Sequence, residues 1–181
     1  MRTPYTSPPL TRDRVLDAAF AVAEHGGLEQ LSMRLLAREL DVSPMALYRH
    51  VANKDDLLDG LVERLLDQLQ LPDDSLAWDQ RLRILATELR ALAHRHPGLF
   101  GLLLRRRAVG ADATRVREAA LRALRDGGLD PETAARRERL LSTVIMGFAL
   151  SEIAGRFAGV ADVDAEFEEA LSLLAGVVTS Q

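Results

Sequence analysis

The chain has 181 residues, no cysteine, 28% charged side chains and a formal net charge of −4. The lack of cysteine excludes disulfides, thiolate nucleophiles and cysteine zinc sites, while 48% apolar residues suffice for a buried core. No apolar run approaches the roughly 20 residues that span a bilayer, and the N-terminus lacks a secretory pattern, so we expect a cytoplasmic protein with no membrane partner.

The charge is unevenly distributed. Residues 1–54 carry seven basic and six acidic side chains, whereas the rest of the chain carries 16 and 21. An acidic body behind a near-neutral end is what we expect if only that end meets phosphate groups.

Apolar residues recur with a helical period along the whole chain, which predicts an all-α fold. After a flexible, proline-rich arm over residues 1–10, the first helix is expected to begin near Thr11 and to end at Gly26-Gly27. A second helix follows Ser32, and a third begins at Ser43-Pro44 and reaches about His50.

A fourth helix is predicted from Asn53, with Asp56 three residues on, and its apolar stripe runs from Leu58 towards Pro72. The second and third helices are too short to be stable alone but are joined by a tight turn. This arrangement predicts a helix-turn-helix, with residues 11–56 as a three-helix DNA-binding domain.

The third helix places a mixed set of side chains on its outer face, because Leu47 and Val51 lie four residues apart and can face the core. Phenol and imidazole groups can bond phosphate oxygens, and an arginine can bind guanine. Lys54, the one lysine of the chain, stands in the first turn of the fourth helix, where free N–H groups already favour a phosphate.

The stretch LSMRLLARELDVSPMALYRHVANKDDLLDGL, residues 31–61, resembles the DNA-binding region of the TetR family of bacterial repressors. The likeness lies in Leu36-Ala37, Val42, Leu47-Tyr48-Arg49-His50-Val51 and Lys54-Asp55-Asp56-Leu57-Leu58. Asp41 departs from the usual turn glycine, but aspartate tolerates the left-handed conformation. Val51 stands where the family commonly has phenylalanine. With valine here, the order Leu-Tyr-x-His-Val resembles the tetracycline-repressor branch.

The resemblance implies a role for each matching position. Arg34 corresponds to a base reader of the second helix. The positions that face the DNA groove are Pro44, Met45, Ala46 and Arg49, and those that contact the DNA backbone are Ser32, Ser43, Tyr48, His50 and Lys54. Singly, each has an ordinary explanation as a core, cap or surface residue, but their shared order and spacing favour DNA binding.

The rest of the chain, residues 57–181, is predicted to be a helical bundle for effector binding and dimerisation. Helices are expected over residues 78–93, 97–104 and 113–124, from 131 onward, and over 163–178. The resemblance implies a ligand cavity among the fourth to eighth of the predicted helices that repositions the fourth. Its candidate lining residues, each of which could equally be ordinary core, are Leu61, Leu65, Leu82, Leu85, Leu89, Phe100, Leu103 and Met146.

A two-fold dimer is expected because one helix-turn-helix covers one half-site. Gly147, Ser151 and Gly155, spaced four apart beside Phe148, form a small-residue stripe that would let another helix approach closely. A helix buried within the monomer would also tolerate this stripe, so both interpretations stay open.

The predicted effector is a small apolar or amphipathic molecule bound without metal or cofactor. Leu85, Leu89 and Phe100-Gly101 stand at the approximate positions that hold a magnesium–tetracycline chelate in the tetracycline-repressor branch, and none can ligate magnesium. His94 and His96 are two apart and splay to different helix faces, which disfavours a metal site.

Two other classes of function are less well supported. A helical enzyme lacks the required motifs, since Ser151-Glu152 has no positioned histidine and there is no phosphate-binding glycine loop. A constitutive DNA-binding protein without an effector remains an alternative to the favoured function, which is a ligand-responsive homodimeric repressor that binds double-stranded operator DNA.

Overall fold

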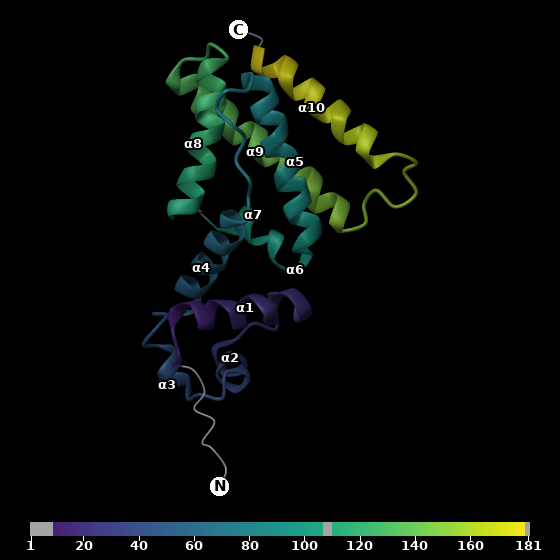
Figure 1. Ribbon diagram of the computed structural model, residues 1–181. Coiled ribbons are helices and arrows are strands. Elements are labelled where there is room, and N and C mark those ends of the chain that lie inside the picture. Colours follow the sequence, from purple (N-terminus) through teal and green to yellow (C-terminus); the bar gives the residue numbers. More distant parts are fainter. Residues whose placement is uncertain (1–8, 107–109, 180–181) are drawn as a thin grey trace. The chain divides into compact units, whose positions relative to one another are not determined.

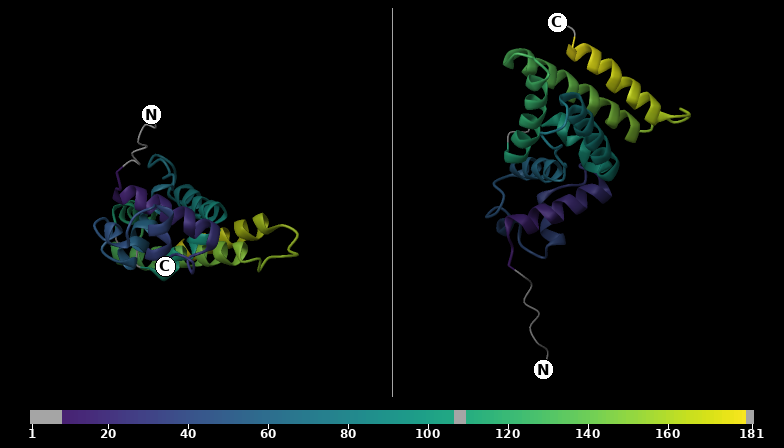
Figure 2. Two further views of the ribbon diagram at one scale, coloured as in Figure 1. Left: turned by 90° about the horizontal axis from the view of Figure 1, so that it is seen from below. Right: turned by 45° about the horizontal axis from the view of Figure 1, so that its top comes forward.

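The computed structural model describes residues 9–106 and 110–179, and every regular element in these ranges is a helix (Figures 1 and 2). The bounds are α1 Arg12–Gly26, α2 Met33–Glu39, α3 Pro44–Leu47, α4 Lys54–Asp67, α5 Trp78–Arg95, α6 Pro97–Phe100, α7 Leu102–Arg105, α8 Ala111–Asp126, α9 Pro131–Ile153 and α10 Val163–Thr179. The all-α prediction is confirmed. Within the described ranges no helix has both the length and the apolar character needed to cross a bilayer.

The chain divides into two compact units, Met1–Leu61 and Val62–Gln181, which we call the head and the body. The division falls inside α4, so this helix contributes its first two turns to the head and its remainder to the body. The domain boundary predicted after residue 56 lies in the first turn of the same helix. The predicted arm over residues 1–10 lies outside the described residues except for its last two positions.

The head is organised around α1, whose start matches the predicted cap. The Thr11 side chain accepts a hydrogen bond from Arg14 N at 3.2 Å, and Gly27 ends the helix with φ +76°. One face is fully buried through Val15 and Ala19. The opposing helix α4 comes close here because Gly60 has no side chain: a Cβ on it would lie 2.6 Å from Leu16 Cδ2.

The turn between α2 and α3 is built by caps and one unusual backbone conformation. Ser32 Oγ accepts from Leu35 N at 3.2 Å, and Ser43 Oγ accepts from Ala46 N at 3.3 Å. Asp41 adopts φ +53°, the left-handed conformation that a turn glycine would supply. The predicted helix starts after Ser32 and at Ser43 and the predicted left-handed turn at Asp41 are therefore confirmed.

Helix α3 has a single regular turn, so its position depends on its neighbours. Leu47 and Val51 are completely buried, as expected for its inner face. At its far end, Arg12 donates to His50 O at 2.9 Å and to both carboxylate oxygens of Asp56 at 3.0 and 2.6 Å. Asp56 also accepts from Ala52 N at 2.8 Å. This Arg12–Asp56 clamp ties the start of α1 to the residues after α3 and to the first turn of α4.

In the body, α5 packs against both α8 and α9 and forms its central layer. Arg81 is almost completely buried near the start of α5 and forms ion pairs with Asp126 at the end of α8 and, at 3.4 Å, with Asp74. Hydrogen bonding to Asp126 raises the pKa of Arg81, so the guanidinium is charged in the folded body. The tip of α8 is thereby held against α5.

Several predicted boundaries differ from the structure. Helix α4 ends at Asp67 rather than near Pro72, because the N–H groups of Gln68 and Leu69 bond three residues back instead of four. Leu57, not Leu58, is its first fully buried leucine. The helix predicted over 97–104 is two short segments, since Gly101 N–H bonds to Leu99 O and interrupts the α-helical ladder.

The Arg12–Asp56 clamp gives a test of head stability. Replacing both residues by alanine, singly and together, should reveal a coupling of about 0.5–1 kcal/mol at neutral pH, modest because both side chains are partly exposed. The Arg12 hydrogen bond lowers the pKa of Asp56, so this coupling should be present at neutral pH and lost as pH falls through that lowered pKa. Urea unfolding measures it, with Arg38→Ala as a surface control; a coupling that is absent, or that persists after protonation of Asp56, would contradict the clamp.

Candidate DNA-binding surface and effector pocket

The head exposes the side chains that the sequence assigns to DNA. Arg34 on α2 and Pro44, Met45, Tyr48 and Arg49 on or just after α3 are exposed, whereas Ala46 and His50 are half-buried. Arg34 and Pro44 border one shallow depression with Ser32, so residues from both sides of the turn meet on one surface. The surface is therefore assembled from both helices of the helix-turn-helix.

The two capping serines retain a donor for phosphate. In Ser32 and Ser43 the oxygen accepts from a backbone N–H, which leaves the hydroxyl proton free to be donated outward. A single serine can therefore start its helix and bond a phosphate oxygen at the same time. Both roles expected of these residues are compatible with one conformation.

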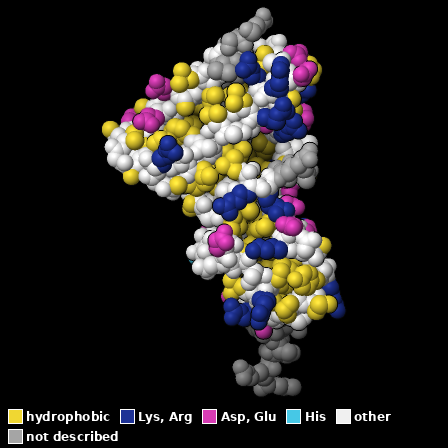
Figure 3. Space-filling model, turned by 180° about the vertical axis from the view of Figure 1, so that it is seen from behind, with side chains coloured by type: hydrophobic (Ala, Val, Ile, Leu, Met, Phe, Trp, Pro, Cys, Tyr) yellow, Lys and Arg dark blue, Asp and Glu magenta, His cyan; other side chains and the backbone are white. Residues whose placement is uncertain are grey.

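Several cations of the head are not neutralised internally, unlike Arg12, which pairs with Asp56. Within residues 9–106 and 110–179, no ion pair is formed by Arg34, Arg38, Arg49 or Lys54. Arg38, which was not among the predicted DNA contacts, borders the same depression as Arg34. Lys and Arg side chains are visible at the lower end of the head in Figure 3. Exposed, unpaired cations are suited to phosphate contacts.

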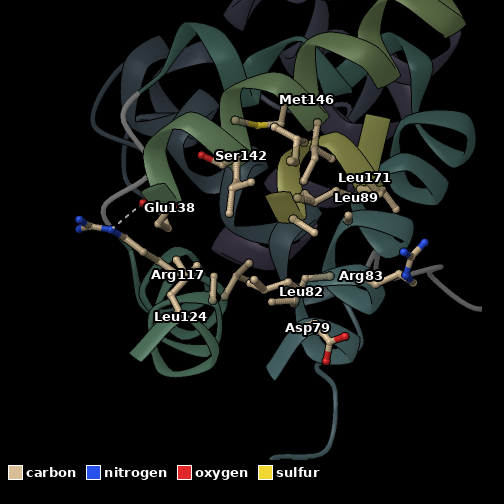
Figure 4. A pocket seen from close by; sticks show the side chains of 18 of the residues that line it. Asp79, Leu82, Arg83, Leu89, Arg117, Leu124, Glu138, Ser142, Met146 and Leu171 are labelled. Carbon is tan, nitrogen blue, oxygen red and sulfur yellow. Dashed lines mark ion pairs between the residues drawn. The ribbon is translucent and has the colours of Figure 1, made fainter. Parts of the chain in front are cut away.

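The body contains a half-enclosed cavity of about 300 Å³ between α5, α8, α9 and α10 (Figure 4). The apolar lining residues are Leu66, Trp78, Leu82, Leu85, Ala86, Leu89, Leu103, Ala113, Val116, Ala120, Leu124, Leu141, Ile145, Met146, Leu171, Leu174 and Ala175. The polar ones are Asp79, Arg83, Arg117, Glu138 and Ser142. A mostly apolar, concave wall with few polar groups is typical of a small-molecule site.

The predicted lining set is brought together only in part. Five of its members face the cavity: Leu82, Leu85, Leu89, Leu103 and Met146. The other three, Leu61, Leu65 and Phe100, do not line it and are completely buried core residues. Helix α10 supplies a wall that was not predicted, because the apolar pattern of a helix does not indicate which partner it meets.

Helix α10 is held in place by a charged cluster at its start. Arg90 binds both oxygens of Glu152, at 2.7 and 2.6 Å, and Asp164 at 2.7 Å, and it stacks over the ring of Phe167 at 4.7 Å. His94 Nε2 also lies 3.1 Å from Glu152. The Arg90 hydrogen bonds lower the pKa of Glu152. Glu152 thus joins α5 to the end of α9, and both of its carboxylate oxygens accept hydrogen bonds.

The part of α4 that lies in the body is bonded to α8 in both directions. Glu63 Oε2 accepts from Asp112 N at 2.9 Å, so its carboxylate caps the N-terminus of α8. Arg115, one turn further on, donates to Leu66 O at 3.0 Å near the end of α4. The carboxylate occupies the space beside Gly110, since a Cβ added there would lie 2.0 Å from Glu63 Cδ. We call this contact the α4–α8 latch.

The small-residue stripe on α9 differs from its prediction. Gly147 and Ser151 lie on α9, but Gly155 follows its end with φ +79° and is not part of the helix face. The ring of Phe148 packs on Phe157 and Phe167 of the same chain, with centroids 4.8 and 5.2 Å away.

Exposed apolar residues extend the stripe instead. Leu140 and Val144 are in register with Gly147 on α9, and Leu173 is exposed on α10. Figure 3 shows a band of apolar side chains across one face of the body. Leu140, Val144 and Leu173 are 45%, 38% and 67% exposed in the single chain.

Two family models match the sequence. Residues 15–61 match "Bacterial regulatory proteins, tetR family", and residues 82–174, about half of the chain, match "Tetracyclin repressor-like, C-terminal domain". The chain belongs to the TetR family. The resemblance seen in residues 31–61 is confirmed, and the match extends through the body.

Individual relatives agree with this membership. The transcriptional repressor DrrR1 of Streptomyces coeruleorubidus is 40% identical over 146 residues, which cover 77% of this chain but only 50% of DrrR1. ActR of Streptomyces coelicolor in complex with actinorhodin is 28% identical, with a TM-score of 0.85 and coverage of 94% of this chain and 97% of ActR. The structure of BioQ with its double-stranded DNA operator is 28% identical, with a TM-score of 0.81 and coverage of 96% of this chain and 100% of BioQ. A second structure is that of BioQ from Mycobacterium smegmatis.

The α4–α8 latch can be tested at its tightest contact. Gly110→Ala should destabilise the body by about 1–3 kcal/mol, because the new methyl group overlaps the Glu63 carboxylate. Gly101→Ala is the control: Gly101 has helical φ and open space around it, so alanine should be neutral or slightly stabilising. Adding Glu63→Ala should relieve most of the cost of Gly110→Ala in urea unfolding, and strict additivity would show that the two residues do not interact.

Proposed function

We propose that this TetR-family protein is a sequence-specific, ligand-responsive transcriptional repressor that acts on double-stranded operator DNA as a homodimer in the bacterial cytoplasm. The observation that carries the DNA-binding part is the head surface, where Arg34 and the outer side of α3 lie together with unpaired cations. BioQ, a structural relative, is solved with its operator, and the same mode of binding is proposed here.

The response to a ligand is proposed to begin in the cavity of the body. An apolar or amphipathic effector held without metal would contact α8 through Val116, Arg117 and Ala120. Helix α8 is fixed to the body half of α4 by the α4–α8 latch. Because α4 continues into the head, a shift of α8 on ligand binding would move α4 and change the DNA affinity of the head.

The dimer is proposed to form through the exposed face of α9 and α10. Leu140, Val144, Gly147 and Ser151 share one side of α9, and Leu173 is exposed on α10. Added at Gly147, a Cβ meets nothing within 4 Å, so the space beside it is open to a second helix. Two-fold pairing would supply the second head that a palindromic operator requires.

Two substitutions separate base reading from phosphate binding, once operators have been selected from a random DNA library. Arg34→Ala should cost about 1–3 kcal/mol on the selected operator and relax preference at one symmetric position. Lys54→Ala should weaken operator and scrambled duplexes alike and reduce the salt slope by about 0.9 for each phosphate that is no longer neutralised, twice that for a dimer. Affinity is measured against salt concentration. Arg125→Ala, at an exposed position of α8 outside the cavity, is a control that should change neither quantity.

Opposite outcomes would reassign these residues. If Lys54→Ala altered sequence preference and Arg34→Ala did not, the roles of reader and anchor would be exchanged. If neither variant affected binding, the head surface would not be the DNA-binding site.

The dimer face gives a separate prediction. Gly147→Arg combined with Ser151→Arg should produce a folded monomer in sedimentation, because two charges would be desolvated at the proposed helix contact. The monomer should retain weak non-specific DNA binding and lose specific affinity. Thr87→Arg, on the exposed side of α5, is the control and should remain dimeric. A double variant that still sediments as a dimer would place the interface elsewhere.

A further inference from the structure

The polar residues of the cavity differ in solvent exposure. The side chain of Glu138 on α9 is only 12% exposed, whereas its partner Arg117 on α8 is 53% exposed. Figure 4 shows Arg117, Glu138 and Ser142 on one side of the pocket and Asp79 and Arg83 on the other. Glu138 is therefore the charged group of this lining that is held deepest on its side of the cavity.

Glu138 is poorly satisfied for a carboxylate in such a position. Among the described residues, its one ion-pair contact is Arg117 Nε to Oε2 at 3.5 Å, which is single and long. Glu152, on the same helix, is equally withdrawn at 12% exposure but receives two short bonds from Arg90 and a further contact from His94. A little-exposed carboxylate is costly unless it is paired and hydrogen-bonded, so Glu138 retains unused acceptor capacity.

Ser142 adds a second acceptor beside it. It lies four residues after Glu138, on the same face of α9, and both line the cavity. The Ser142 hydroxyl donates to Arg139 O at 3.2 Å, so its oxygen lone pairs remain to accept from a ligand. Two acceptors on an apolar wall call for a ligand group that carries several donors.

We propose that the cavity takes an amphipathic amine, whose ammonium group binds Glu138 and Ser142 while its apolar body lies against Leu82, Leu89 and Met146. This inference rests on the proposed effector function and specifies the chemistry of its ligand. A cavity of about 300 Å³ is at the small end of ligand sites and suits one or two fused rings. The arginines are weaker anchors for an anion: Arg83 is already paired with Glu168, and half-exposed Arg117 is hydrated.

Three probes with the same ring system and different head groups test the proposal: naphthylethylamine, naphthylethanol and naphthylacetate. By calorimetry on the full chain, the amine should bind at least about tenfold more tightly than the alcohol or the carboxylate, the strength of a charge-assisted hydrogen bond. Glu138→Gln should remove this preference while leaving alcohol binding unchanged. The matched control is Glu118→Gln, since Glu118 pairs with Arg125 at the same 3.5 Å but is 48% exposed and lies outside the cavity; it should retain the preference.

A second measurement distinguishes a ligand-binding carboxylate from a structural one. Without any probe, Glu138→Gln should leave the melting temperature unchanged or raise it, whereas Glu152→Gln should lower it, because only Glu152 is bonded on both oxygens. A fall for Glu138→Gln as large as that for Glu152→Gln would make Glu138 a structural residue and overturn the proposal. So would stronger binding of the carboxylate probe, an amine affinity that Glu138→Gln leaves unchanged, or no amine binding up to about 1 mM.

These results are separable from a failure of the proposed function. Glu118→Gln, the control outside the cavity, should bind selected operator DNA as the parent does when no probe is present. If the alcohol or carboxylate released the operator and the amine did not, the repressor function would stand and the amine would be excluded. If the parent chain selected no operator at all, the proposed function would fail, while the order of probe affinities would still decide the ligand class.

Discussion

The rest of the structure depends on α4, a single helix that has to satisfy two hydrophobic cores. Its first half places Leu57 and Leu61 in the head, and its second half places Leu65 and Leu66 in the body. The helix cannot turn about its axis to improve one core without disturbing the other. Within the head, Gly60 allows the close approach to α1, because a Cβ there would lie 2.6 Å from Leu16 Cδ2. In the body, the α4–α8 latch bonds the second half of this helix to α8.

The reading surface depends on local hydrogen bonds more than on helix length. Helix α3 has one turn, which cannot be stable by itself. Its start is fixed by Ser43, its inner side by Leu47 and Val51, and its far end by the Arg12–Asp56 clamp. The positions of side chains on so short a helix therefore depend on all three of these attachments. Loss of any one of them should therefore displace the exposed side chains of α3.

The body combines satisfied and unsatisfied charges on the same two helices. Arg81 is buried and pairs with Asp126 and Asp74, which holds α8 against α5. Glu152 bonds Arg90 through both oxygens and joins α9 to α5, and Arg90 also pairs with Asp164 of α10. Glu138 is as withdrawn as Glu152 and has one long contact. A carboxylate that is bonded on both oxygens has little capacity left for a ligand, whereas a binding group has to keep acceptor capacity. Glu152 therefore has a structural role, whereas Glu138 has the proposed ligand-binding role.

Much of the head was determined by the sequence alone. Thr11, Ser32 and Ser43 act as caps through their own side chains on the next turn, and Asp41 tolerates a left-handed backbone, so these features are local and could be predicted. The helical period likewise predicted which faces of α1, α4 and α5 are apolar.

Only the tertiary structure decided which of those apolar faces meet. Leu61, Leu65 and Phe100 have the same character as Leu82 and Leu89, yet the first three are core and the other two line the cavity. Glu63 and Glu138 look like ordinary surface glutamates in the sequence, and their roles arise from partners 49 and 21 positions away, Asp112 and Arg117. Periodicity reports that a face is buried but not against what, because pairing between distant helices is set by the shape and charge of both surfaces together.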